Sequence, residues 1–156
     1  MRMCIHRHDR TDRGAAAVEF ALVMPILILL LAGIVNFGFV LAQQLSLNSA
    51  ARQAARYAVV DGPTCGDVQA EGQDSAATIG MTASQVPTPV ITRGQGATYS
   101  SAPCPKPCED AETNDNIKIT MTRAGASNPW VIGFPPFNLL TVPTLTGTGV
   151  MRCEFS

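Results

Sequence analysis

The residues able to do chemistry are few and lie in separate parts of the chain. Only two histidines are present, His6 and His8, and both lie among the first ten residues with Cys4. The other cysteines come much later: Cys65, Cys104, Cys108 and Cys153. Because no histidine accompanies them or the later serines, catalysis of the Ser–His or Cys–His kind lacks its base. The sequence therefore predicts no catalytic residue and no enzymatic activity.

The four later cysteines form an even set, which predicts two disulfides with three possible connectivities and an oxidising compartment. We favour one bridge from Cys65 into the loop that holds Cys104 and Cys108, with the remaining loop cysteine bonded to Cys153. A zinc site is the weaker interpretation, since three residues separate Cys104 from Cys108 and no histidine follows them.

Two other groups of residues could bind a metal, but each has a simpler interpretation. One is the N-terminal set of Cys4, His6 and His8, a short polar tail. The other is an acidic loop without the spacing and central glycine of a calcium loop: Glu109, Asp110, Glu112 and Asp115. We expect no metal and no cofactor. A net charge of −1 without a basic face also predicts no nucleic-acid partner. The sequence also lacks a glycine-rich phosphate-binding loop, so we expect no small-molecule substrate.

The most informative polar residue is Glu19, which directly precedes a long apolar segment. From Phe20 to Ala42 the chain has 23 residues, of which only Asn36 is strongly polar. As a helix this segment measures about 35 Å, enough to cross a hydrocarbon core of about 30 Å. Acids inside a membrane are costly, from about 2.5 kcal/mol at the helix centre, and are functional by default. Snorkelling of Glu19 to the inner interface is the alternative.

The flanking charges predict the orientation of this helix. Residues 1–14 hold four arginines and two aspartates, and the positive-inside rule places them in the cytoplasm. The chain after about residue 43 is then extracytoplasmic. A secretory signal cleaved after Ala42 is the competing interpretation, but its apolar region would be longer than the usual 7–15 residues.

Two features inside the apolar segment predict local geometry. Pro25 removes a backbone hydrogen bond and should bend the helix. Asn36 between Gly33 and Gly38 is typical of helix–helix contacts in lipid, although a single Asn near the outer interface can also simply be tolerated.

The helix should continue beyond the membrane. Small and apolar residues recur at helical spacing up to Asp61-Gly62-Pro63, which supplies a stop. We therefore predict one helix from about Ala15 to Val60.

The remaining chain predicts a small α+β domain outside the membrane. A short helix is expected from Asp67 to Met81, and three strands at Pro89 to Arg93, Asn116 to Arg123 and Thr144 to Cys153. The predicted fold is an α+β membrane protein: one long helix, half transmembrane and half external and amphipathic, with a disulfide-stapled domain of a short helix and about three antiparallel strands. The expected divisions are residues 1–14 (basic leader), 15–42 (transmembrane helix), 43–62 (external extension) and 63–156 (external domain).

Several motifs resemble TadE-like pilus assembly proteins, the pseudopilins or minor pilins of the tight-adherence (Tad/Flp) system. They are Arg13-Gly14-Ala15-Ala16-Ala17-Val18-Glu19-Phe20, then Asn36-Phe37-Gly38, Gln43-Gln44, the alanine-rich run from Ala50 to Ala58, and the ending from Leu145 to Arg152. The resemblance implies that a prepilin peptidase cuts between Gly14 and Ala15. It also implies that Glu19 is the assembly carboxylate, paired with the new amine of a neighbouring subunit.

The resemblance implies a single-pass bacterial membrane protein without enzymatic activity, with its N-terminus in the cytoplasm and its C-terminal domain outside. The expected partners are other pilin-like subunits, the Tad assembly machinery, the prepilin peptidase and membrane lipid. Helix contacts are expected at Glu19, Phe20 and Asn36. The alternative function is a membrane-anchored binding module that uses the apolar loop from Trp130 to Leu140.

Overall fold

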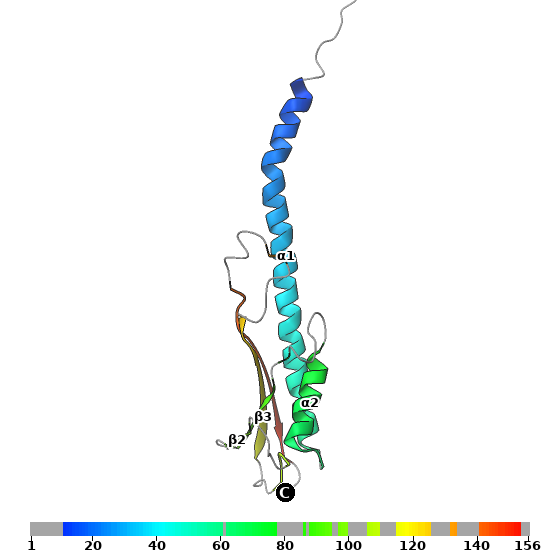
Figure 1. Ribbon diagram of the computed structural model, residues 1–156, viewed down its shortest axis with the longest axis vertical. Helices are drawn as coiled ribbons and strands as arrows, with labels where there is room; N and C mark the ends of the chain where they lie inside the picture. The colour runs from blue at the N-terminus through cyan, green and yellow to red at the C-terminus, as the bar shows by residue number, and fades with distance from the viewer. Residues whose placement is uncertain are drawn as a thin grey trace, which may run out of the picture.

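The structure is a computed structural model, in which one very long helix supports a small α+β domain at its C-terminal end (Figure 1). It describes residues 11–60, 62–77, 86, 88–94, 97–99, 106–109, 115–125, 132–133 and 141–153. The helices are α1 (Thr11–Ala58) and α2 (Cys65–Ala76). The strands are β1 (Val90–Arg93), β2 (Ala97–Tyr99), β3 (Asn116–Arg123) and β4 (Leu145–Arg152).

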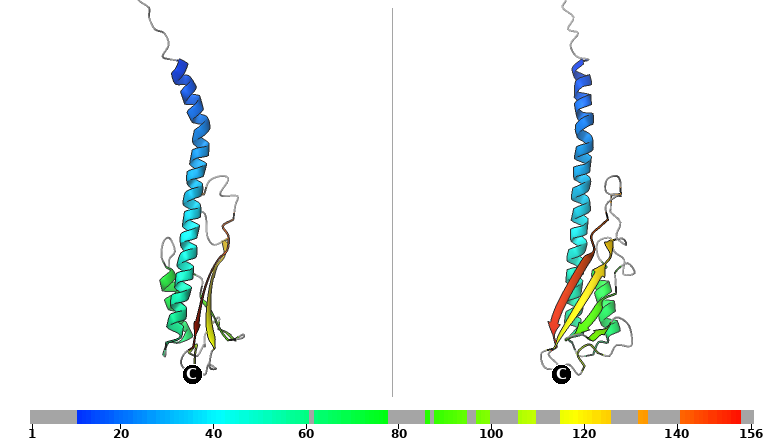
Figure 2. Two further views of the ribbon diagram at one scale, coloured as in Figure 1. Left: turned by 180° about the vertical axis from the view of Figure 1, so that it is seen from behind. Right: turned by 90° about the vertical axis from the view of Figure 1, so that its left-hand side faces the viewer.

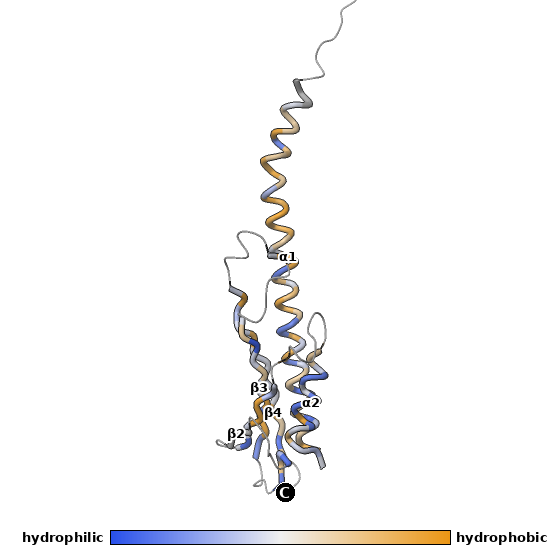
Figure 3. Tube along the Cα trace, viewed as in Figure 1, coloured by the Kyte–Doolittle hydropathy of each residue, from blue (hydrophilic) through white to orange (hydrophobic). Residues whose placement is uncertain are grey.

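Helix α1 has 48 residues and is continuous through Gly14, so it measures about 72 Å. The prediction of one long helix is confirmed, although α1 begins at Thr11 rather than Ala15 and ends at Ala58 rather than Val60. It bends in its N-terminal half, which contains Pro25, as the left-hand view of Figure 2 shows. Apolar residues dominate that half, whereas polar residues are interspersed in the half beside the domain (Figure 3).

Helix α2 begins at Cys65, two residues before the predicted start at Asp67, because Thr64 is its N-cap. The Asp67 N–H donates to the Thr64 hydroxyl, and the Thr64 N–H donates to the Asp67 carboxylate at 2.9 Å. This reciprocal capping box satisfies two N–H groups that a helix start otherwise leaves without partners. The helix ends at Ala76; residues 78–81 of the predicted helix lie outside the described part of the chain.

The four strands form one antiparallel sheet in the order β2-β1-β3-β4. The three predicted strands are present, shortened by one residue at Pro89 and by one at each end of the last strand. Strand β2 was not predicted. It pairs with β1 in a hairpin whose loop begins at Gly94, where the positive φ of 51° favours glycine. The sequence Gly94-Gln95-Gly96 before Ala97-Thr98-Tyr99 is a short-range hairpin signal.

Strand β4 lies directly on the backbone of α1. A Cβ added to Gly147 would come within 2.4 Å of the Leu47 carbonyl oxygen, and one on Gly149 within 2.2 Å of that of Ala51. Four helical residues rise about 6.0 Å and two strand residues about 6.6 Å. The glycine pair therefore matches one turn of α1, and β4 runs alongside the helix in the same direction.

Larger side chains fill the space beside this close approach. Strand β3 alternates buried and exposed residues, and its buried Ile119 and Met121 are the register partners of Gly149 and Gly147. On the face of the sheet that packs on α1, β4 therefore has no side chain at its two glycines, and the larger side chains of β3 fill the space beside them. The hydrophobic core contains buried residues of α1, α2 and the sheet: Leu47, Ala50, Ala51, Ala54, Ala55, Ala58, Val68, Ile91, Ile117, Ile119, Met121 and Leu145.

Helix α2 packs on α1 at another glycine. A Cβ on Gly72 would lie 3.3 Å from the Cβ of Ala54 and 2.8 Å from the Cγ of Pro89. At the exposed edge of this helix pair, the Gln53 amide donates a hydrogen bond to the Glu71 carboxylate at 2.9 Å. The alanine-rich half of α1 is therefore covered by β4 and by α2.

A disulfide ties the chain after β4 to a loop of the domain. Cys108 is bonded to Cys153, which directly follows β4, one of the pairs left open by the sequence. Closing this 45-residue separation should contribute about 4 kcal/mol. Cys65 is also disulfide-bonded; Cys104 and Cys4 lie outside the described residues.

The glycine contact predicts a strong effect of one methyl group. Gly149→Ala forces β4 away from the Ala51 carbonyl, and we expect it to lower stability by about 2–3 kcal/mol. Thermal unfolding of the full chain in detergent should show this as a melting temperature lower by about 10 °C or more. Gly38→Ala adds the same methyl group where nothing lies within 4 Å and should not destabilise. Equal melting temperatures for the two variants would contradict the close contact.

The capping box predicts a pH effect. Hydrogen bonds from the Thr64 hydroxyl and then from its N–H lower the pKa of Asp67. The carboxylate therefore stabilises the folded state above its unfolded pKa of about 4, and the contribution is lost as pH falls through the lower folded pKa. The difference in melting temperature between wild type and Asp67→Asn should thus shrink on acidification from pH 7 to pH 2.5. A difference that stays constant would contradict this role of the carboxylate.

Candidate functional site: the exposed apolar half of the long helix

The N-terminal half of α1 projects away from the domain with its side chains uncovered. Every residue from 14 to 31 is exposed, including Leu22 and Ile26 at 70%. Within the described part of the chain, one helix is long and apolar enough to cross a membrane, and it is this one. Such a surface is too large and too apolar for a monomer in water, so it marks contact with lipid or with other helices.

The residues expected at the processing site all lie on this exposed half. Ala15 and Glu19 are one turn apart on the same face of α1, and Glu19 and the neighbouring Phe20 are exposed. Gly14 has open space around it. The structure thus presents Glu19 on an uncovered helix surface, in a position to meet a group from another molecule.

The bond between Gly14 and Ala15 lies at the end of the first turn of α1, since the helix begins at Thr11. The first four N–H groups of a helix have no partner within it, and helix ends fray. Unwinding this turn therefore costs little compared with unwinding a turn inside the helix.

Asn36 differs from the rest of the apolar segment because it is fully buried. Its Nδ2 donates to the Ile132 carbonyl at 3.2 Å, and its Oδ1 accepts from the Ile132 N–H at 2.9 Å. The side chain thus satisfies both backbone groups of one residue in the external domain. The expected helix–helix contact at Asn36 stays a prediction, and within this chain the amide is engaged by Ile132.

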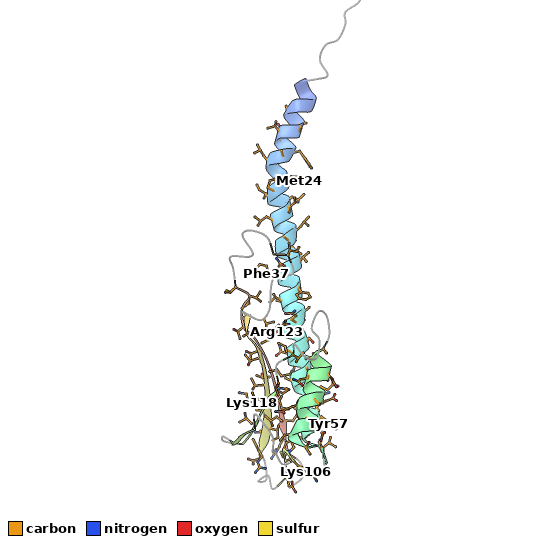
Figure 4. All side chains as sticks on the ribbon, viewed as in Figure 1. Met24, Phe37, Tyr57, Lys106, Lys118 and Arg123 are labelled. Atoms are coloured by element: carbon orange, nitrogen blue, oxygen red, sulfur yellow. A yellow bond between two sulfur atoms is a disulfide. The ribbon has the colours of Figure 1, made fainter. Side chains whose placement is uncertain are left out.

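A continuous stripe on α1 shows where the domain begins to cover the helix. Ala32, Asn36 and Val40 are buried at intervals of four residues, and the stripe continues through Gln43 and Leu47. Other faces remain uncovered, as at Phe37, which is 59% exposed (Figure 4). The apolar segment predicted from Phe20 to Ala42 is therefore uncovered up to residue 31 and covered along one stripe beyond it.

Polar contacts also anchor the external half of α1. Gln44, one of the two glutamines at the predicted membrane boundary, donates to the Thr146 carbonyl of β4 at 2.8 Å. At the end of β3 nearer Phe37 (Figure 4), Arg123 is buried, and the loss of water around its guanidinium lowers its pKa. The sequence singled out Gln44 only as part of the Gln43-Gln44 motif and gave Arg123 no role, because nothing local distinguishes their side chains from solvated polar ones.

The other candidate sites fall largely outside the described residues. Of the apolar loop from Trp130 to Leu140, only Ile132 and Gly133 are described. Of the acidic loop, Glu109 and Asp115 are described, and Asp115 lies 3.8 Å from the Arg93 guanidinium. No group of three metal-binding side chains occurs among the residues that the structure describes.

Comparison with known proteins agrees with the features of α1. The family model described as TadE-like protein matches residues 14–56, the stretch that starts at Gly14 and includes the alanine-rich surface beneath β4. No curated protein and no solved structure matches the chain. The resemblance to TadE-like pilus assembly proteins inferred from the motifs is therefore confirmed over residues 14–56 of the chain.

Proposed function

We propose that this chain is a non-enzymatic pseudopilin or minor pilin of a Tad/Flp-type pilus, held in the cytoplasmic membrane by the N-terminal half of α1. The carrying observation is that one unbroken helix bears Glu19 on its uncovered apolar half and a small folded domain on its other half. A component of this kind contributes helix surface to an assembly while its domain stays outside the membrane. The family match to residues 14–56 supports the same role.

The apolar half of α1 sets the expected topology. Its uncovered surface is long enough to cross the bilayer, and the arginines among residues 1–14 favour a cytoplasmic N-terminus. The domain then lies outside, where a disulfide such as Cys108–Cys153 persists. Lipid, other pilin-like subunits, the Tad assembly machinery and a prepilin peptidase are the partners that this topology implies.

The proposed role of Glu19 follows from the cost of isolated charges in lipid. Cleavage after Gly14 would create an amine on Ala15, and a neighbouring subunit's Glu19 could pair with it. Each charge would then offset the burial cost of the other, and the pair would set the stagger between subunits. Negative charge in the first turns of α1 also interacts favourably with the helix dipole.

We predict that the mature chain begins at Ala15. Intact-mass measurement should show loss of residues 1–14 in cells that contain the prepilin peptidase, and the full-length chain in cells that lack it. Gly14→Leu, which blocks a site requiring a small residue before the cut, should give the full-length chain in both. A mature chain that begins at Gln43 would instead identify a cleaved secretory signal.

We predict that Glu19→Gln abolishes assembly while preserving the external domain. A photo-crosslinking residue at Leu22, which is exposed, should report contacts with partner helices in cells. Crosslinking should fall at least about tenfold, because one charge left alone in lipid costs more than the 1.4 kcal/mol that a factor of ten represents. Surface piliation should be lost in parallel.

The control is Glu109→Gln, which makes the same chemical change at an exposed acid of the external domain. It should leave crosslinking and piliation unchanged. Unchanged crosslinking and piliation in Glu19→Gln itself would show that the carboxylate has no part in assembly.

A further inference from the structure

We infer that Ile132 lies in the outer leaflet of the membrane, held there by Asn36, so that the external domain contacts lipid at this residue in addition to standing above it. The inference rests on the membrane-spanning role of α1 proposed above. Its evidence is the position of one side chain–backbone pair along that helix.

The first step is the depth of Asn36. It follows Phe20 by 16 residues, which is about 24 Å along a helix. If the hydrocarbon core of about 30 Å begins near Phe20, Asn36 lies inside its outer part. Ile132 bonds to Asn36 and must lie at the same depth.

The second step is the surface around that level. Ile34, Val35 and Phe37 flank Asn36 and are all about half exposed or more. Apolar side chains therefore face outward at the level of the Asn36–Ile132 pair. This is the pattern expected where lipid surrounds α1 and Ile132 together.

The third step is the hydrogen bonding of the pair. Irregular backbone is tolerated at membrane depth only where its N–H and C=O groups are satisfied within the protein. Asn36 supplies the donor and the acceptor that Ile132 needs, and Ile132 in turn satisfies the amide of Asn36. Four polar atoms are thus paired in a place where water is scarce.

The composition of the chain agrees with this placement. No Asp, Glu, Lys, Arg or His occurs between Arg123 and Arg152. The sequence around Ile132 can therefore enter lipid without bringing a charge into it.

Trp130 provides a direct probe, because it is the only tryptophan in the chain. Two residues of chain reach at most about 7 Å, so Trp130 reports on the depth of Ile132. The full chain is reconstituted in phosphatidylcholine vesicles whose acyl chains carry bromine at carbons 6,7 or at carbons 11,12. We expect blue-shifted emission and stronger quenching by the shallower 6,7-dibromo lipid.

Asn36→Leu tests whether the Asn36 amide holds Ile132 in the lipid. It removes the partners of the Ile132 N–H and C=O and leaves α1 more apolar, so Ile132 should leave the lipid and quenching of Trp130 should fall at least about twofold. Gln44→Leu removes a similar amide that donates to the Thr146 carbonyl outside the apolar segment, and should leave quenching unchanged. Circular dichroism and an intact Cys108–Cys153 bond confirm that each variant is folded.

Flotation with the vesicles separates the two proposals. A chain that floats but whose tryptophan is unquenched by either lipid overturns this inference and leaves the membrane anchor in place, whether the emission is red-shifted (water) or blue-shifted (protein cover). Unchanged quenching in Asn36→Leu also overturns it. A chain that does not float overturns both the anchor and this inference.

Discussion

The contact between the backbones of β4 and α1 determines how this molecule is built. Gly147 and Gly149 place the strand against the Leu47 and Ala51 carbonyls, closer than any residue with a Cβ could lie. Dispersion forces weaken steeply with distance, so this approach gains contacts that a looser layer would lose. The match between two strand residues and one helical turn extends the contact along the strand, and the larger side chains of β3 close the space beside it.

This contact gives the domain a fixed position on the same helix that is long and apolar enough to cross a membrane. The same stripe of α1 passes from the alanine-rich surface under β4 to Val40, Asn36 and Ala32, so the two halves of the helix are joined without a flexible linker. A force or displacement applied to the apolar half is therefore transmitted to the domain through continuous helix. For a component whose helix is held by neighbouring subunits, the domain orientation would follow from that of the helix.

Much of this architecture could be predicted from the sequence, because its signals are local. The long helix follows from a long apolar run and from the absence of Gly and Pro between Gly38 and Gly62, and β3 follows from the alternation of apolar and polar residues from Ile117 to Met121. The start of α2 was predicted two residues late, because the capping box of Thr64 and Asp67 was not recognised. The hairpin partner β2 was missed because three residues give too short a pattern. The role of Gly147 and Gly149 in β4 could not be predicted, because it depends on a helix about one hundred residues earlier in the chain.

The residues of the candidate site also divide into those that the local sequence distinguishes and those that only the fold explains. Gly14, Glu19 and Phe20 stand out from their neighbours along the chain, whereas the partner of Asn36 could not be found from its neighbours. Polarity inside an apolar segment indicated that Asn36 needs a hydrogen-bonding partner. Only the fold shows that Ile132, 96 residues away, supplies one within the same chain.

Native-state hydrogen exchange of the full chain in lipid nanodiscs tests the shared helix–strand core most directly. If β4 and α1 form one cooperative unit, the amides of α1 from Leu47 to Ala55 and those of β4 should open with the same free energy and lose protection together in Gly149→Ala. Slow exchange of that part of α1 while the β4 amides exchange freely would contradict the account, because the helix would then be stable without the strand.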